Sequence, residues 1–254
     1  MFRRPFLRTL AASTLGLAFT AAAHAAPHAE PLTLEVYNPG GTSLFPVSST
    51  IVAGKTEVLL IDAQFQRNDA EALVARIRAS KDGKLAYWGP ILKDKAPQEV
   101  IVPAPLNGTH LTVDGQRLDI TGPEPERRFV WVPSLRAVVG GIPVAANIHV
   151  WMADTQTPAS RQQWQKTLKA ITTLQPRTVV PGHYLPNPDG SAPTTLAAVR
   201  FTQAYLQTFE QAAARAGDST QLIAAMKHHY PQLGESASLE LGAKVVKGEL
   251  KWPQ

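Results

Sequence analysis

The sequence contains no cysteine in its 254 residues. Disulfides, thiolate nucleophiles, iron–sulfur clusters and cysteine-bound zinc are therefore excluded, and any metal ion must be held by histidine, aspartate, glutamate or backbone oxygen. Charged residues are also few, at 18% of the chain against 44% for hydrophobic residues. A chain of this length and composition can bury a substantial core, which argues against extended disorder.

The sequence has little excess of basic residues once its first 25 residues are set aside. Arg3, Arg4 and Arg8 lie in that segment, which holds no Asp or Glu. The remainder has 22 basic and 20 acidic residues, a net charge of +2. Proteins that bind nucleic acids carry a strongly basic surface. We therefore expect no nucleic-acid partner.

Long hydrophobic runs are absent outside the N-terminal segment. Arg3 and Arg4 begin a basic region that resembles the twin-arginine export motif, and the apolar stretch 9–23 is too short to span a bilayer. Ala23-His24-Ala25 then matches the small-x-small pattern of a signal-peptidase site. The pattern predicts a signal peptide over residues 1–25 and a periplasmic or secreted mature protein without a stable membrane anchor. An uncleaved N-terminal membrane anchor is the alternative.

The first half of the mature sequence is rich in strand patterns. Leu32, Leu34 and Val36 alternate with polar residues, the period of a half-buried strand. Two further pairs of strands flank the turn sequences Gly54-Lys55 and Asp114-Gly115, which predicts two β-hairpins. The predicted strands are residues 32–37, 50–53, 57–61, 110–113, 116–120, 128–132, 136–139, 147–151 and 177–180.

Helical patterns lie between and after these strands. Asn68 and Glu71 form a capping box for one helix, and Thr157-Pro158 caps another that carries Trp164 on its buried face. Three more helices are predicted over about 194–215, from near Ser219 to Pro231, and from near Ser236 to Gly248. Strands followed by interleaved and trailing helices predict a layered sheet-and-helix domain.

Histidine is the residue here most able to bind a metal or move a proton. His183 follows a short strand and a Pro-Gly turn, which would hold its ring at a strand end facing a cleft; a ring that hydrogen-bonds within the turn fits equally well. His149 and Trp151 lie two residues apart on a predicted strand and should share a face, with Asp154 after them. His149 and Asp154 could reach one site, and the alternative is a core histidine satisfied by a neighbouring carboxylate. The remaining histidines of the mature chain are interpreted as leader, surface or helix-end residues: His28, His110, His228 and His229.

The order of these features resembles the metallo-β-lactamase superfamily. The hairpin that ends in Val58–Asp62, the capped helix after it, the Trp-containing helix and the segment 179–183 carry the resemblance, over most of residues 45–185. It implies an α/β fold, an αβ/βα sandwich over residues 26–190, with a helical segment over 191–254 packed on the same domain. Members of this superfamily hydrolyse lactams, lactones, thioesters and phosphodiesters with one or two zinc ions at the sheet edges.

The resemblance also implies a set of zinc ligands that this sequence lacks at most positions. The His-x-His-x-Asp-His motif is missing, because the predicted helix runs directly into residues 80–84, where the fold would place further strands and a helix. Pro123 stands where the resemblance implies a histidine, and Gly141 where it implies a bridging aspartate. His183 matches the Pro-Gly-His ligand, and Asp62 matches an aspartate that supports the ligands without touching the metal.

Three functions remain open, each with a small molecule as substrate or ligand. The first is an exported protein with a degenerate metal site and weak or no hydrolase activity, because one imidazole cannot hold zinc against water. The second is a zinc hydrolase of an ester, lactone or lactam that uses His149, Asp154 and His183 as a rebuilt site. The third is a periplasmic ligand-binding domain in which the Pro-Gly-His turn is coincidental. Zinc content separates the first two.

Overall fold

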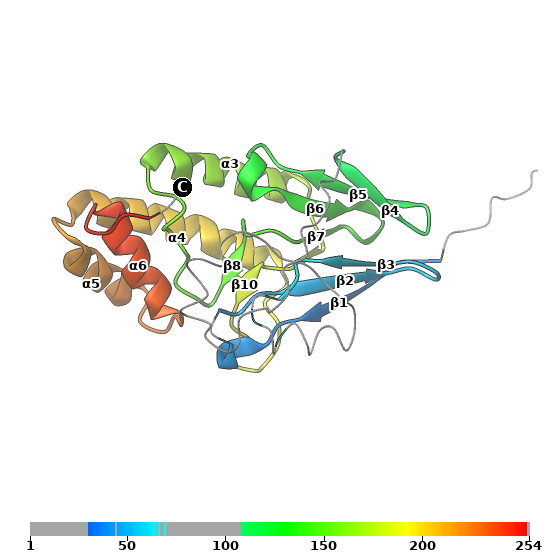
Figure 1. The fold of residues 1–254 in the computed structure, drawn as a ribbon, viewed down its shortest axis with the longest axis horizontal. Helices are drawn as coiled ribbons and strands as arrows, with labels where there is room; N and C mark the ends of the chain where they lie inside the picture. Colours follow the sequence, from blue (N-terminus) through cyan, green and yellow to red (C-terminus); the bar gives the residue numbers. More distant parts are fainter. Residues whose placement is uncertain (1–29, 44, 65, 67–68, 70–107, 253–254) are drawn as a thin grey trace, which may run out of the picture.

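The computed structural model describes residues 30–43, 45–64, 66, 69 and 108–252. In this part of the chain, three sheets and four long helices form a layered α/β structure (Figure 1). The helix predicted after Asn68 and the shortened region that follows it lie outside the described residues. None of the described helices is long and apolar enough to cross a bilayer.

Most of the described strands and helices follow one another in the order that the sequence patterns predict. The strands are β1 (Thr33–Tyr37), β2 (Ser49–Ala53), β3 (Val58–Ile61), β4 (His110–Val113), β5 (Gln116–Thr121), β6 (Phe129–Val132), β7 (Ala137–Val139), β8 (Ala145–Ala146), β9 (Thr178–Val179) and β10 (His183–Tyr184). The helices are α3 (Pro158–Thr173), α4 (Leu196–Arg215), α5 (Ser219–His229) and α6 (Ser236–Val246), with short 3-10 turns at Gly40–Thr42, Pro125–Arg127 and Pro133–Leu135.

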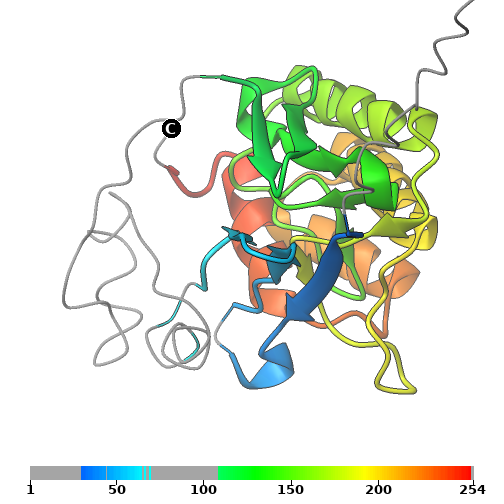
Figure 2. The same cartoon turned by 90° about the vertical axis from the view of Figure 1, so that its right-hand side faces the viewer.

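The strands form one sheet of three strands, one of five and one of two. The first is antiparallel in the order β1-β2-β3. The second has the order β4-β5-β6-β7-β9, in which β9 pairs parallel with β7 and the other pairs are antiparallel. The third pairs β8 with β10 in parallel. Figure 2 shows the five-stranded sheet in front of the helices.

The turn at Asp114-Gly115 forms as predicted and contacts the β2–β3 hairpin. Asp114 and Gly115 both adopt positive φ, 46° and 73°, as a two-residue hairpin turn requires. The Asp114 carboxylate also accepts a hydrogen bond of 2.8 Å from the Thr56 backbone N–H in the β2–β3 hairpin. The hydrogen bonds from Thr56 lower the pKa of Asp114. The two sheets are therefore joined at their hairpin tips.

Two hydrophobic cores separate the layers. The smaller core lies between the first two sheets, with Val52 and Ile61 on one side and Leu118 and Val132 on the other. The larger core lies between the strands and α3–α6, and its largest fully buried side chains are Phe129, Met152, Leu168, Ile171, Tyr205, Leu206, Phe209, Leu222, Met226 and Leu239. The helices α4–α6 thus share a core with α3 and the sheet.

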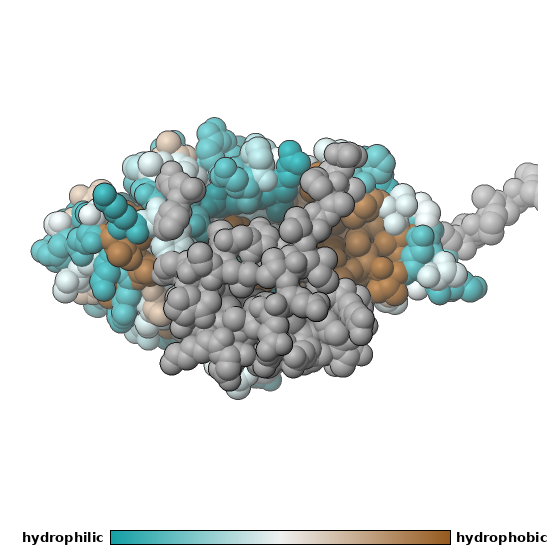
Figure 3. All heavy atoms as spheres, viewed as in Figure 1, coloured by the Kyte–Doolittle hydropathy of each residue, from teal (hydrophilic) through white to brown (hydrophobic). Residues whose placement is uncertain are grey.

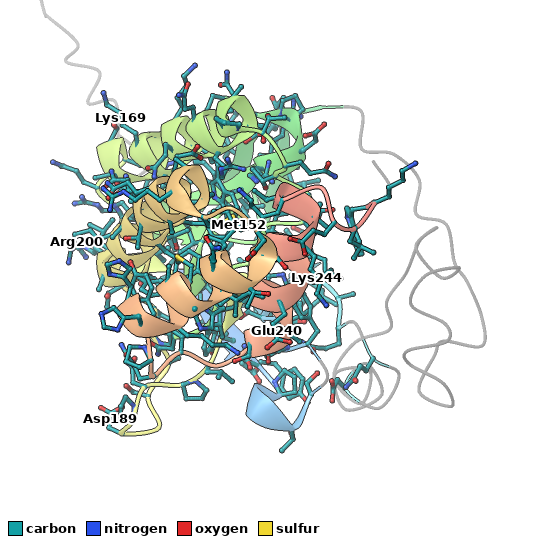
Figure 4. The ribbon with its side chains drawn as sticks, turned by 90° about the vertical axis from the view of Figure 1, so that its left-hand side faces the viewer. Met152, Lys169, Asp189, Arg200, Glu240 and Lys244 are labelled. Carbon is teal, nitrogen blue, oxygen red and sulfur yellow. The ribbon has the colours of Figure 1, made fainter. Side chains whose placement is uncertain are left out.

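Figures 3 and 4 show how apolar and charged residues are distributed over these layers. Met152, which is fully buried, lies near the centre of the view in Figure 4, whereas the charged side chains of Lys169 and Arg200 lie at the edge. Hydrophobic residues form a surface patch at the end of the molecule where β1–β3 lie (Figure 3). Val58 of β3 is 58% exposed.

Two glycine backbones touch where the sheets meet. A Cβ on Gly182 would lie 2.1 Å from the Gly141 carbonyl oxygen, and a Cβ on Gly141 would lie 2.2 Å from the Arg128 carbonyl oxygen. Gly182 also donates to the Val144 carbonyl at 3.0 Å and accepts from the Ser48 N–H at 2.8 Å. This contact joins the segment before β2, the loop after β7 and the turn before β10.

The strand predicted over 147–151 is wrong. Asn147 has φ of 60°, which ends β8, and its side chain donates to the Leu185 carbonyl at 2.9 Å. Beyond it only Ile148 forms a β-bridge, to Gly234. The chain therefore leaves the sheet at Asn147, although its apolar and polar residues alternate.

The other strand predictions within the described residues are confirmed, with ends that shift by one or two residues. The helices predicted after residue 157 are also confirmed. The Thr157 hydroxyl caps α3 by accepting from the Ser160 N–H, and Pro158 occupies the first turn. The two-residue strands β8 and β10 were too short to show a periodic pattern.

Candidate functional site

A pocket of about 240 Å³ lies beside the Pro-Gly-His turn. We call it the His183 pocket. Nine of its lining residues are apolar and four are polar or charged. The apolar residues are Phe45, Val47, Ile142, Ala145, Ile148, Val150, Trp151, Trp164 and Trp252, and the others are Arg127, Asp154, His183 and Ser238.

Pairing between β8 and β10 places His183 in this pocket, opposite Ala145. Its Nδ1 lies 3.0 Å from the Pro46 carbonyl oxygen, and its ring centroid lies 4.5 Å from that of Phe45. A carbonyl can only accept, so Nδ1 carries the hydrogen. Burial lowers the pKa of His183, and the bond to Pro46 opposes this shift. Burial thus favours the neutral ring, in which Nε2 is an acceptor.

Asp154 orients two tryptophans along one wall of the His183 pocket. Its Oδ2 accepts from the Trp151 indole at 2.9 Å and its Oδ1 from the Trp252 indole at 2.7 Å. The two indole rings meet edge to face, with centroids 5.3 Å apart, and Phe45 meets Trp151 in the same way at 5.8 Å. Edge-to-face contacts are favourable for aromatic rings. Both carboxylate oxygens thus serve to position an aromatic wall.

Arg127 also lines the pocket and is only 4% exposed. Its Nη1 donates to Glu124 at 2.8 Å, its Nη2 donates to the Thr155 hydroxyl, and its guanidinium carbon lies 4.6 Å from the Trp164 ring centroid. No sequence pattern pointed to this residue. An arginine after a Pro-Glu turn is usually exposed, so its sequence neighbours carried no signal of burial.

His149 does not line the His183 pocket. Its Nδ1 lies 3.0 Å from the Tyr205 hydroxyl, and the residue is 1% exposed. The shared face predicted for His149 and Trp151 is therefore wrong, because Trp151 lines the pocket and His149 lies in the core. His149 is a core histidine, and its partner is a tyrosine from α4 rather than a carboxylate.

The described residues do not fit a zinc ion. Within ranges 30–43, 45–64 and 108–252, with residues 66 and 69, no three His, Asp or Glu side chains form a group that could hold a metal. His149, Asp154 and His183 are therefore not brought together. Residues 70–107 contain no histidine at all. Zinc sites in proteins need three or four such donors.

Asp62 contacts the position where the resemblance implies the bridging aspartate. Its Oδ2 accepts from the Gly141 N–H at 2.7 Å. Burial raises the pKa of Asp62, and the bond from Gly141 opposes the shift. Gly141 has φ of 71° and no room for a Cβ. Asp62 thus stabilises a backbone turn that has no space for a ligating side chain.

The burial of His149 predicts that the protein loses stability in acid. Burial lowers its pKa from 6.5 to about 4, with a contribution from Lys227. The unfolded chain therefore takes up a proton near pH 6.5 and the folded chain only near pH 4, so stability falls as pH decreases through this window. We expect the free energy of unfolding to fall by about 2 kcal/mol between pH 7 and pH 5 from this residue. Urea denaturation at both pH values measures it.

The matched variant is His149→Gln, whose amide does not titrate and can still bond to Tyr205. We expect it to lose less stability than the parent over the same pH interval. An equal loss in the two proteins would show that His149 does not cause the acid sensitivity.

No protein-family model and no curated protein sequence matches the chain. Several solved structures are similar to the chain. A metallo-β-lactamase family protein from Thermus thermophilus is 13% identical, with 84% of this chain and 91% of that chain aligned and a TM-score of 0.54. The DIM-1 metallo-β-lactamase is 18% identical over 71% and 98%, with a TM-score of 0.41, and a metallo-β-lactamase from Hirschia baltica is 11% identical over 70% and 98%, with a TM-score of 0.38. The similarity to the Thermus protein, together with the layered sheets and helices, shows that the chain has the metallo-β-lactamase fold.

Proposed function

We propose that this chain is an exported relative of the metallo-hydrolases with a degenerate zinc site, which binds an apolar small molecule in the His183 pocket without hydrolysing it. The observation that carries the proposal is the lining of this pocket. Nine apolar residues, four of them aromatic, surround a space at the position of the Pro-Gly-His turn. Concave sites with mostly apolar walls and a few polar groups are typical of small-molecule binding.

The size of the pocket supports a small ligand. A buried apolar cavity of roughly 150 Å³ accepts benzene, so about 240 Å³ suits a molecule on the order of ten non-hydrogen atoms. Removing apolar surface of ligand and wall from water provides the affinity. The edge-to-face rings of Phe45, Trp151 and Trp252 make that wall aromatic.

The donor inventory supports the loss of zinc chemistry. Gly141 and Pro123 supply no ligating side-chain atom where the resemblance implies ligands, and Gly141 has no space for a larger side chain. A metal-activated water needs several fixed donors to hold the metal that lowers its pKa. The alternative function is a weak zinc hydrolase, favoured by one observation: His183 and Asp154 both line the pocket.

Zinc content separates these two functions. After dialysis of the purified chain against excess zinc and then against metal-free buffer, we expect well below one zinc per chain by mass spectrometry of the metal. We also expect hydrolysis of nitrocefin and of a simple lactone at the rate of buffer alone. One zinc per chain that is lost in His183→Ala would establish the hydrolase and refute the degenerate site.

Naphthalene tests the binding proposal directly, by isothermal titration calorimetry. Val47 lines the pocket, so Val47→Phe fills part of the space and should weaken naphthalene binding about tenfold. Val58→Phe makes the same change on exposed β3 and is the control. Equal affinities in the two variants would place the binding site elsewhere.

The N-terminal pattern supports export. A basic start, a short apolar stretch and Ala23-His24-Ala25 fit signal cleavage before Ala26. Expression in a Gram-negative host should yield a periplasmic protein that begins at or near Ala26, as read by mass spectrometry of the intact chain. Full-length protein retained in the membrane fraction would instead support the uncleaved anchor.

A further inference from the structure

Arg127 has a hydrogen-bond donor that no contact among the described residues uses. Its two terminal nitrogens donate to Glu124 and Thr155, whereas its Nε is buried and has no acceptor in that part of the chain. Arginine is always charged and presents all of its N–H groups as donors. A buried donor without a partner is unfavourable, and natural proteins rarely keep one without a reason. Since Arg127 lines the His183 pocket, an acceptor on a bound molecule is the partner that its position suggests.

The charges around the pocket indicate the kind of acceptor. Arg127 is already paired with the Glu124 carboxylate at 2.8 Å. Asp154 adds a second carboxylate on the aromatic wall. Two carboxylates therefore accompany one guanidinium, and His183 is neutral, so a further anion would be repelled in a space with little water. The acceptor that fits is uncharged.

The polarity of the other walls limits what accompanies this acceptor. The indoles of Trp151 and Trp252 donate their N–H groups to Asp154, and the Trp164 indole donates to the Pro143 carbonyl at 2.7 Å. Because their N–H groups are used in this way, these rings line the pocket with carbon atoms. A flat aromatic body is the partner that such rings favour.

We propose that the His183 pocket selects neutral aromatic molecules that carry one hydrogen-bond acceptor, such as a ketone or amide oxygen, and that the Nε–H of Arg127 donates to it. This inference rests on the proposed binding function and specifies its ligand class. Arg127 acts here as a specificity residue: it distinguishes molecules of equal shape by whether they can accept a hydrogen bond. The rings of the pocket supply the affinity that such molecules share.

Three naphthalene derivatives of similar shape test the proposal by calorimetric titration at neutral pH. Acetylnaphthalene has the neutral acceptor, ethylnaphthalene lacks it, and naphthoate carries an anion. On the unchanged protein we expect acetylnaphthalene to bind about ten- to a hundredfold more tightly than ethylnaphthalene, the range that one hydrogen bond to a charged donor gives. Naphthoate should bind more weakly than acetylnaphthalene.

Two variants assign this preference to Arg127. Arg127→Lys keeps a cation beside Glu124 but has no Nε–H, so the preference for acetylnaphthalene should shrink to about twofold or less, while ethylnaphthalene binds as before. Arg136→Lys is the matched control, because Arg136 is exposed and does not line the pocket. Thermal melts show whether each variant folds. If Arg127→Lys does not fold, the relative affinities of the three ligands for the unchanged protein test the proposal.

The outcomes separate this inference from the function on which it rests. Equal binding of acetylnaphthalene and ethylnaphthalene overturns the role of Arg127 and leaves the apolar binding function standing. Tightest binding of naphthoate overturns the selection for neutral molecules. A preference for acetylnaphthalene that persists in Arg127→Lys shows that another group donates the hydrogen bond to the ketone. No binding of any naphthalene overturns both.

Discussion

The backbone contact between Gly141 and Gly182 fixes the geometry around the His183 pocket. Both residues lack the space for a Cβ, because each would place one about 2 Å from a carbonyl oxygen. Gly182 bonds to the Val144 and Ser48 backbones, so the contact holds the loop after β7 and the segment before β2 against the turn that presents His183. Asp62 adds a carboxylate bond to the Gly141 N–H. The same close approach that positions the histidine leaves no room for an aspartate at residue 141.

Polar residues of the His183 pocket are engaged by neighbouring groups. Asp154 binds two indole N–H groups and orients an aromatic wall. His183 donates to the Pro46 carbonyl and packs against Phe45. Arg127 is anchored by Glu124 and Thr155 and keeps one donor for the pocket. On the proposed function, these polar groups orient the walls of the pocket and one of them contacts the ligand.

Much of the fold could be predicted from local patterns. Alternation predicted the strands, Asp114-Gly115 predicted a hairpin turn, and Thr157-Pro158 predicted the start of α3, since each depends on residues a few positions apart. The resemblance to the metallo-β-lactamase superfamily correctly predicted the layered α/β fold. The strand over 147–151 was wrong because the positive φ of Asn147 is stabilised by a distant partner, Leu185, that no local pattern shows.

The site was less predictable than the fold, because its contacts join residues that are far apart in the sequence. Tyr205 lies 56 residues from His149, and Trp252 lies 98 residues from Asp154. Spacing along the chain could suggest that His149 and Asp154 share a site, yet tertiary packing turns His149 into the core. The burial of Arg127 likewise depends on Trp164 and Thr155, which belong to later segments. Of the three candidate residues, His183 and Asp154 line the pocket and His149 does not.

The central claim is that the space beside the Pro-Gly-His turn receives an apolar molecule and not a metal ion. Hydrogen–deuterium exchange of the backbone amides in 142–152 and 183–185 tests it most directly, with acetylnaphthalene and with zinc in separate samples. Ligand that fills the pocket should slow exchange in both segments, and zinc should leave their exchange unchanged. Slower exchange with zinc, and none with acetylnaphthalene, would contradict the account.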